Sequence, residues 1–429
     1  MSNWFHRNPL KATSKVTFEL GAMAESISAR HICSDAASQR ANILKLMGDA
    51  SVDSDTMISR ASNYISILMG FVNPPENSQE TTNKLRGAIL FKWSNSAEAK
   101  HSPPIVEPDA LFEVCSMLFT VALWLTKHAA KVAAKDEVSQ DEAKDVHLSL
   151  RQAAGIFLVL KEKYTQNLLA PPKPGHDLHT DILDAYIYQS TAEAQEITVA
   201  RAIELKHDAG LIASVAKETA AVYEKSSFAL KPYDLKVMGK WLKYLEFKKH
   251  CYDTCAYIYY AEHLLKQEKA GLALAVIAEA EKTYKQSLEV AKAYARADGV
   301  GLSAKPADHC FFRRLGTMVE STRRKLEREN GIIFHQRVPT AAPTFDLKAK
   351  FGVAEPKTPD IDFTPDPRWK DAYNGFNETK LLESITTRDA RAKQHKEKSD
   401  RDAPVEPIPE KPIFHTDKDP KTDSGCVLS

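Results

Sequence analysis

An apolar periodicity of three and four residues runs through most of the chain and restricts it to a helical fold. Its clearest stretch is an uncharged run of 13 residues from Val114 to Thr126. Apolar side chains recur there at the spacing of one helix face, in a stripe too broad for an exposed helix. The run is also too short to cross a bilayer. It predicts a buried helix, with Asp109 as its N-terminal cap.

The same periodicity recurs over residues 141–163, 180–206 and 211–224 and predicts further long helices. We expect Gly210 to break the pattern and Asp208 to cap the helix that follows. Between residues 240 and 285, large aromatic residues alternate with Ala and Gly, which is typical of nested antiparallel helices in a helical repeat. Because only one such unit is visible, the sequence predicts a repeat-like core within a larger helical domain.

The character of the chain changes after Arg337. Ten of the 22 prolines lie between Ala341 and Ser429, and the apolar periodicity stops. The expected organisation is therefore a helical domain over residues 1–355, a Pro-rich and largely extended tail over 356–425, and a separate C-terminal motif over 426–429. Near the other end, Trp4 and Phe18 bound a segment that we expect to form a small N-terminal β element, either a short strand or an extended segment attached to the body.

Composition excludes several classes of protein. The chain has 58 basic and 57 acidic residues, a formal net charge of +1, whereas nucleic-acid binders usually carry a marked basic excess. Its six cysteines are scattered and form neither a disulfide framework nor a paired zinc motif. The N-terminal residues do not resemble a secretory signal. We therefore expect a cytoplasmic protein that binds no nucleic acid and no metal.

No familiar catalytic motif is present, since the sequence has no G-x-G-x-x-G, P-loop, G-x-S-x-G or H-E-x-x-H pattern. Cys251 and Cys255 lie one helical turn apart and are either a buried packing pair or a redox or metal pair. Glu193 and Glu196 are either solvated or hydrogen-bonded to neighbouring helices. These residues do not support an enzyme, so we expect no catalytic site, cofactor or small-molecule substrate.

The last four residues, Cys426 to Ser429, are a cysteine, two aliphatic residues and a serine. This is the pattern required for prenylation, and a terminal serine favours a farnesyl group. The alternative is a chance match. One lipid chain gives only weak and reversible membrane binding, so stable residence needs a second contact. We expect Cys426 to be farnesylated and the protein to associate peripherally with membranes.

Several motifs resemble the Bro-one-domain family, which includes Alix. They are Trp4–Thr13, Ala122–Trp124, Ala153–Phe157, Ala192–Glu196 and Ala200–His207, together with the C-terminal tetrapeptide. The resemblance covers roughly residues 1–355 and implies a mainly α, boomerang-shaped domain with a helical-repeat-like core and a small sheet.

The resemblance also implies a function. Family members bind the C-terminal amphipathic helix of charged multivesicular body proteins, the subunits of ESCRT-III, through an apolar patch on a concave face. Carried over by position, the apolar contacts are Thr198, Leu211, Ile212 and Val215, and the polar contacts are Asp141, Lys144 and Arg201. Thr198 replaces a phenylalanine of Alix, which implies a shallower patch.

The residues agree with this assignment in part. Leu211 and Val215 are four apart and so share one helix face, as a groove for a partner helix requires. The alternative is that both are ordinary core residues. The resulting hypothesis is a membrane-tethered ESCRT-associated adaptor that acts at endosomal or nuclear-envelope sites. The competing hypothesis is a helical scaffold that binds other peptides.

Overall fold

A computed structural model describes residues 4–74, 83–98, 103–135, 137–301, 306, 310–394 and 405–413. Its helices are α1 (Ile27–Met47), α2 (Ser54–Val72), α3 (Ala110–Ala133), α4 (Gln140–Val159), α5 (Thr180–Glu204), α6 (Ala209–Leu230), α7 (Leu235–Lys266), α8 (Ala270–Arg296), α9 (Cys310–Glu329), α10 (Trp369–Ala372) and α11 (Glu378–Gln394). Strands β1 (Phe91–Trp93) and β2 (Ile105–Glu107) form one small sheet.

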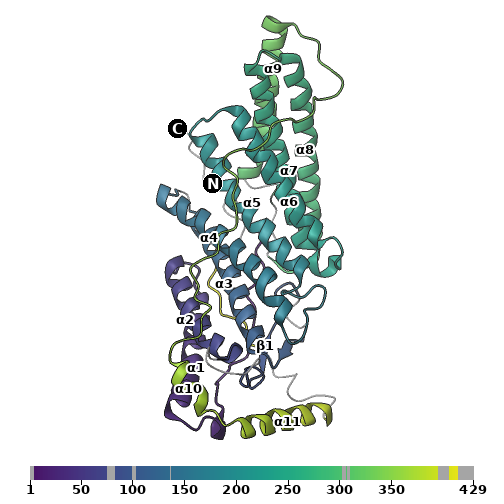
Figure 1. The fold of residues 1–429 in the computed structure, drawn as a ribbon. Helices are drawn as coiled ribbons and strands as arrows, with labels where there is room; N and C mark the ends of the chain where they lie inside the picture. Colours follow the sequence, from purple (N-terminus) through teal and green to yellow (C-terminus); the bar gives the residue numbers. More distant parts are fainter. Residues whose placement is uncertain are drawn as a thin grey trace.

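Each helix from α1 to α8 packs against the next one in the sequence. The result is an elongated, boomerang-like body with α1, α2, α10 and α11 at one end and α8 and α9 at the other (Figure 1). The most extensive contacts join α6, α7 and α8, which include the aromatic and small residues noted in the sequence. The prediction of a mainly α fold with a repeat-like core is confirmed.

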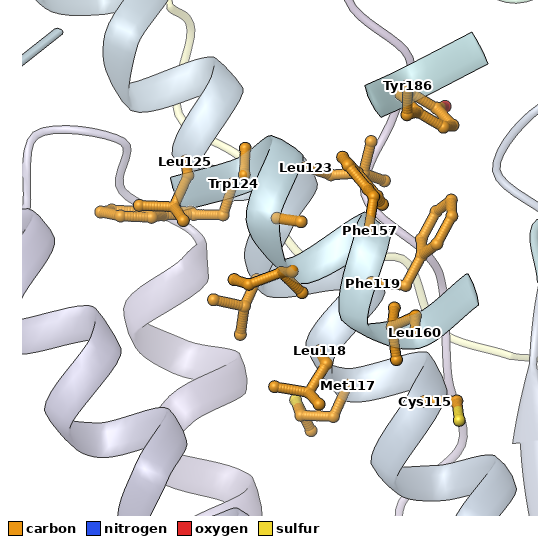
Figure 2. Close-up of a cluster of buried hydrophobic side chains, with 14 of the residues drawn as sticks. Cys115, Met117, Leu118, Phe119, Leu123, Trp124, Leu125, Phe157, Leu160 and Tyr186 are labelled. Carbon is orange, nitrogen blue, oxygen red and sulfur yellow. The ribbon is translucent and has the colours of Figure 1, made fainter. Parts of the chain in front are cut away.

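Helix α3 forms the centre of the core. Asp109 caps it by accepting a hydrogen bond from the backbone N–H of Leu111. The ring of Phe119 packs edge-on against the rings of Phe157 on α4 and Tyr186 on α5, with distances of 5.2 and 5.4 Å between ring centroids (Figure 2). Among the described residues, α3 is the one helix long and apolar enough to cross a membrane, and that apolar part is wholly buried within the body. The predicted buried helix is confirmed.

The connection between α5 and α6 differs from the prediction at Gly210. The break lies before it, where Lys206 adopts a left-handed φ of 53°. Asp208 does cap α6, accepting from the N–H of Gly210 within the first turn. Gly210 instead lies in the first turn of α6 and faces α7, where an added Cβ would lie 2.6 Å from Nδ1 of His263.

The β element is also placed differently. Its antiparallel strands lie between α2 and α3 in sequence rather than at the N-terminus. The N-terminal segment contributes an isolated bridge, in which Thr13 pairs with Trp93 of β1. The segment is nevertheless firmly attached, because Trp4 and Phe18 are each 2% exposed.

Packed chain continues beyond residue 355. We call residues 335–368 the strap; it contains no helix or strand and runs from the end of α9 to α10. There Trp369 is buried, and its indole donates a 2.9 Å hydrogen bond to the carbonyl of Ile67 on α2. Residues 405–413, the docking segment, return to the body beside Thr13. Cys426 and its motif lie outside the described residues.

Candidate partner-binding site

The structure brings the sequence-predicted contact residues onto three consecutive helices. The first turns of α4 hold Asp141 and Lys144, the end of α5 holds Thr198 and Arg201, and the first turns of α6 hold Leu211, Ile212 and Val215. Helix α5 packs on both α4 and α6, so the three helices that carry these residues are neighbours in the fold. We call this set the α4–α6 surface.

The apolar members of the surface differ in accessibility. Thr198 and Leu211 are half-buried, whereas Ile212 is 2% and Val215 1% exposed. Adjacent residues on a helix point about 100° apart, so Ile212 cannot share the direction of Leu211. Val215 does share a face with Leu211. Its burial therefore has a different cause.

That cause is the strap. Gly352 lies over the α5–α6 junction, where an added Cβ would be 3.0 Å from Cγ2 of Thr198 and 3.5 Å from Cγ2 of Val215. Its φ of +79° is also a conformation that side chains disfavour. Backbone thus covers Val215 and leaves Leu211 partly open. The site is a composite of three helices and the strap, which the sequence did not predict.

Gln195 holds this arrangement together from beneath. Its carboxamide Nε2 donates to the carbonyl of Val215 at 3.2 Å and to Oγ1 of Thr219 at 3.0 Å. Its Oε1 accepts from the backbone N–H of Ala354 in the strap at 3.1 Å. One buried amide therefore joins α5, α6 and the strap, and hydrogen bonding repays its desolvation.

The two glutamates that flank Gln195 are buried and hydrogen-bonded, which excludes the solvated alternative for them. Glu193 receives a bidentate ion pair from Arg7, with distances of 2.9 and 2.8 Å. Glu196 pairs with Lys248 of α7 at 2.8 Å and accepts from the Trp4 indole at 2.9 Å.

The cations in this network were not predicted from the sequence. A signal did exist, because two glutamates within a buried, Ala-rich helix require buried partners. What the sequence could not show is which cations reach them. Both Arg7 of the N-terminal segment and Lys248 of α7 do so, and they bind distant parts of the chain to α5.

Charged side chains at the edge of the α4–α6 surface remain accessible. Lys144 pairs with Asp141 at 2.9 Å, with side chains 68% and 91% exposed. Arg201 pairs with Glu204 at 2.9 Å, again near solvent. Such exposed pairs contribute about 0–1 kcal/mol to stability. They can therefore exchange partners at little cost when another charged protein approaches.

The environment of Cys251 and Cys255 favours a packing role over a redox or metal-binding role. Cys251 and Cys255 are buried free thiols. Burial raises the pKa of Cys255 to about 12 and that of Cys251 still further, which suppresses the reactive thiolate. Across the part of the chain that the structure describes, no three His, Cys, Asp or Glu side chains gather as metal ligands would.

Comparison with known proteins places this architecture in a family. A family model described as the BRO1-like domain matches residues 17–385. The BRO1 domain-containing protein BROX of Danio rerio is 40% identical over 428 residues and covers all of both chains. The human BROX protein is 44% identical over 356 residues, covering 83% of this chain and 86% of the relative.

Solved structures show the same fold at low sequence identity. A Bro1 domain studied for endosomal targeting superposes with a TM-score of 0.65 at 19% identity, covering 90% of this chain and 100% of that one. The ALIX BRO1 domain in complex with CHMP4C gives a TM-score of 0.63 at 17% identity, covering 83% and 96% of the two chains.

Proposed function

We propose an adaptor function for this chain, which belongs to the BRO1-like domain family. In this proposal it is not an enzyme, and its α4–α6 surface binds the C-terminal amphipathic helix of an ESCRT-III charged multivesicular body protein. The observation that carries the proposal is the half-open Leu211 in the first turn of α6, while the neighbouring helices α4 and α5 carry accessible charges. The ALIX BRO1 domain, which binds CHMP4C, supports it through the shared fold.

The geometry indicates how such a helix would be recognised. Apolar residues spaced three and four apart would contact Leu211 and Thr198, as in other complexes of a helix with an apolar surface. Lys144 and Arg201 would meet acidic residues of the partner. Because Gly352 covers Val215, we propose that the backbone of the strap forms the floor of the contact and that Val215 supports it from below.

A second contact would be with the membrane, through a farnesyl group on Cys426. The lipid and the peptide contact are each weak. Joined in one chain they reinforce each other through effective concentration, without either being strong. The protein would then be cytoplasmic and peripherally membrane-bound, at endosomal or nuclear-envelope sites where ESCRT-III assembles.

Substitution of Leu211 tests the peptide contact. We expect Leu211→Asp to weaken binding of a CHMP4C C-terminal peptide at least tenfold in a calorimetric titration. The change removes an apolar contact worth about 1.5–3 kcal/mol and forces a carboxylate to desolvate. Leu235→Asp is the matched control, because Leu235 is 58% exposed in the first turn of α7, beyond the far end of α6.

The circular dichroism spectrum and melting temperature of both variants should match those of the unsubstituted chain. Equal affinity for Leu211→Asp and the unsubstituted protein would show that the surface is assigned wrongly. If CHMP4C peptide does not bind while an unrelated amphipathic helix does, the chain is instead a scaffold for other peptides.

A further inference from the structure

The docking segment, residues 405–413, packs against elements that are far from it in sequence. Glu406 and Thr13 exchange two backbone hydrogen bonds of 3.1 Å, and the N–H of Lys411 donates to the carbonyl of Gly48 at 2.8 Å. Thr13 also forms an isolated bridge to Trp93 of β1, so single-residue bridges connect the segment through Thr13 to the edge of the small sheet.

Two isoleucine side chains of the segment pack against hydrophobic clusters of the body. Ile408 is 7% exposed and belongs to the main core, and Ile413 packs on the cluster that contains Trp4. The backbone of the docking segment passes close to Gly48, where an added Cβ would lie 2.7 Å from the carbonyl oxygen of Pro409. Glu406 and Lys411 donate backbone hydrogen bonds to the body. The prolines of the segment have no backbone N–H and therefore need no acceptor.

Independent support comes from a lysine of the body. Lys127 on α3 is 5% exposed, and burial lowers its pKa. In the described part of the chain it forms an ion pair with Glu410 of the docking segment. The same carboxylate accepts a 3.0 Å hydrogen bond from the N–H of Leu10. With the segment seated, the ammonium of Lys127 is buried with Glu410 as its counter-charge, and removing that carboxylate alone would leave the charge unpaired, which is strongly unfavourable.

A second, more exposed ion pair also attaches the docking segment to the body. The ammonium of Lys411 contacts Oδ2 of Asp49 at 2.6 Å, and this contact is the largest cause of the lowered pKa of that aspartate. Asp49 follows α1, whereas Lys127 lies on α3. The segment therefore joins the N-terminal segment, the α1–α2 turn and α3 with charges of both signs.

We propose that residues 405–413 are an intramolecular ligand that fixes where the C-terminal lipid leaves the body; the lipid part of this proposal rests on the proposed function. Cys426 is the thirteenth residue after Ile413. At 3.3–3.6 Å per residue this stretch reaches at most about 45 Å. Without docking, 32 residues would follow Gln394, with a maximum reach of about 110 Å. The seated segment would thus hold the N-terminal side of the body near the membrane.

Hydrogen exchange on the full-length chain tests the docking by itself. We expect Ile408→Asp to raise exchange at the Thr13 amide at least tenfold, because that amide donates to Glu406. The Ser14 amide, which donates to Lys92, should keep its protection and serves as an internal control. Glu406→Gln is the matched variant, since only the backbone of Glu406 is used. Unchanged exchange at Thr13 in Ile408→Asp would overturn the proposal.

A double-mutant cycle tests the role of Lys127. Glu410→Ala should raise Thr13 exchange in the native background, and should have a several-fold smaller effect when Lys127 is already replaced by Met. An equal effect in both backgrounds would show that the ion pair does not hold the segment.

Membrane geometry is then measured with farnesylated full-length protein on phosphatidylcholine vesicles that carry dansyl-labelled lipid. We expect Ile408→Asp to bind vesicles as well as the unsubstituted chain while energy transfer from tryptophan to dansyl falls at least twofold. Equal transfer would show that the segment does not set the reach. Cys426→Ser should abolish vesicle binding and leave Thr13 protected, so failure of the lipid proposal is distinguishable from failure of docking.

Discussion

Gly352 of the strap lies against Val215 of α6, where a Cβ at position 352 would lie 3.5 Å from Cγ2 of Val215, an ordinary van der Waals contact. This relationship decides which residues of the α4–α6 surface a partner can reach. Val215 is covered, and Leu211 is not. The surface of a helical pair is thereby converted into a composite of helix side chains and strap backbone.

Substituting Gly352 should destabilise the strap. We expect Gly352→Ala to lower the free energy of unfolding by about 1–2 kcal/mol, because φ is +79° and the new methyl group would crowd Thr198 at 3.0 Å. Urea unfolding measures the change. Gly331→Ala is the control, since a Cβ there meets no atom within 4 Å. Equal effects of the two substitutions would contradict the covering role of Gly352.

The buried pair between Arg7 and Glu193 should be essential to the body. Glu193→Gln leaves the guanidinium buried without a counter-charge, which typically costs about 3–5 kcal/mol. We expect a loss of this size in urea unfolding monitored by tryptophan fluorescence. Glu204→Gln also breaks an arginine–glutamate pair, but an exposed one, and should change stability by less than about 1 kcal/mol.

Acid should destabilise the protein through His6. Burial and the neighbouring charge of Arg7 lower the pKa of His6 from 6.5 to about 3. Between these values the unfolded chain binds the proton and the folded chain does not, so this contribution to stability is present above pH 6.5 and is lost as pH falls toward 3. The expected slope is up to about 1.4 kcal/mol per pH unit.

Replacing His6 with glutamine should remove this contribution. The imidazole contacts Tyr294 and Asn8 at 3.2 Å, and Lys240 adds further positive charge that disfavours protonation. Stability measured at pH 7 and pH 5 should therefore change less in His6→Gln than in the unsubstituted chain. The exposed His207→Gln should leave the difference intact; a similar reduction there would refute the assignment to His6.

Loss of the lipid should relocate the protein. In fractionated eukaryotic cells, Cys426→Ser is expected to move the chain from the membrane pellet to the cytosol, because a farnesyl group cannot form on serine. Intact-mass measurement of the unsubstituted protein should show the added prenyl group. Ser429→Ala is the matched control, since alanine is also accepted at the last position. Equal membrane fractions for Cys426→Ser and the unsubstituted chain would disprove lipid anchoring.

Local patterns were sufficient to predict the helices between α3 and α8 and two of their caps, whereas α10 and α11 lie within residues 356–425, which were expected to be largely extended. The apolar run through Val114 predicted the buried α3, and Asp109 and Asp208 cap as expected, because periodicity and capping depend on residues close in sequence. The contact residues on α4–α6 came from family resemblance rather than from spacing. Gly210 was assigned the wrong role, because its neighbour His263 is more than fifty residues away.

Tertiary structure alone decided what covers and supports the site. The strap and the docking segment have no apolar periodicity, so nothing local predicts that Gly352 reaches Val215 or that Glu410 reaches Lys127. Their positions follow from long-range contacts, in which a buried lysine needs a carboxylate and a backbone amide needs an acceptor. Such requirements can be recognised in a sequence, but only the folded chain shows which distant residue meets them.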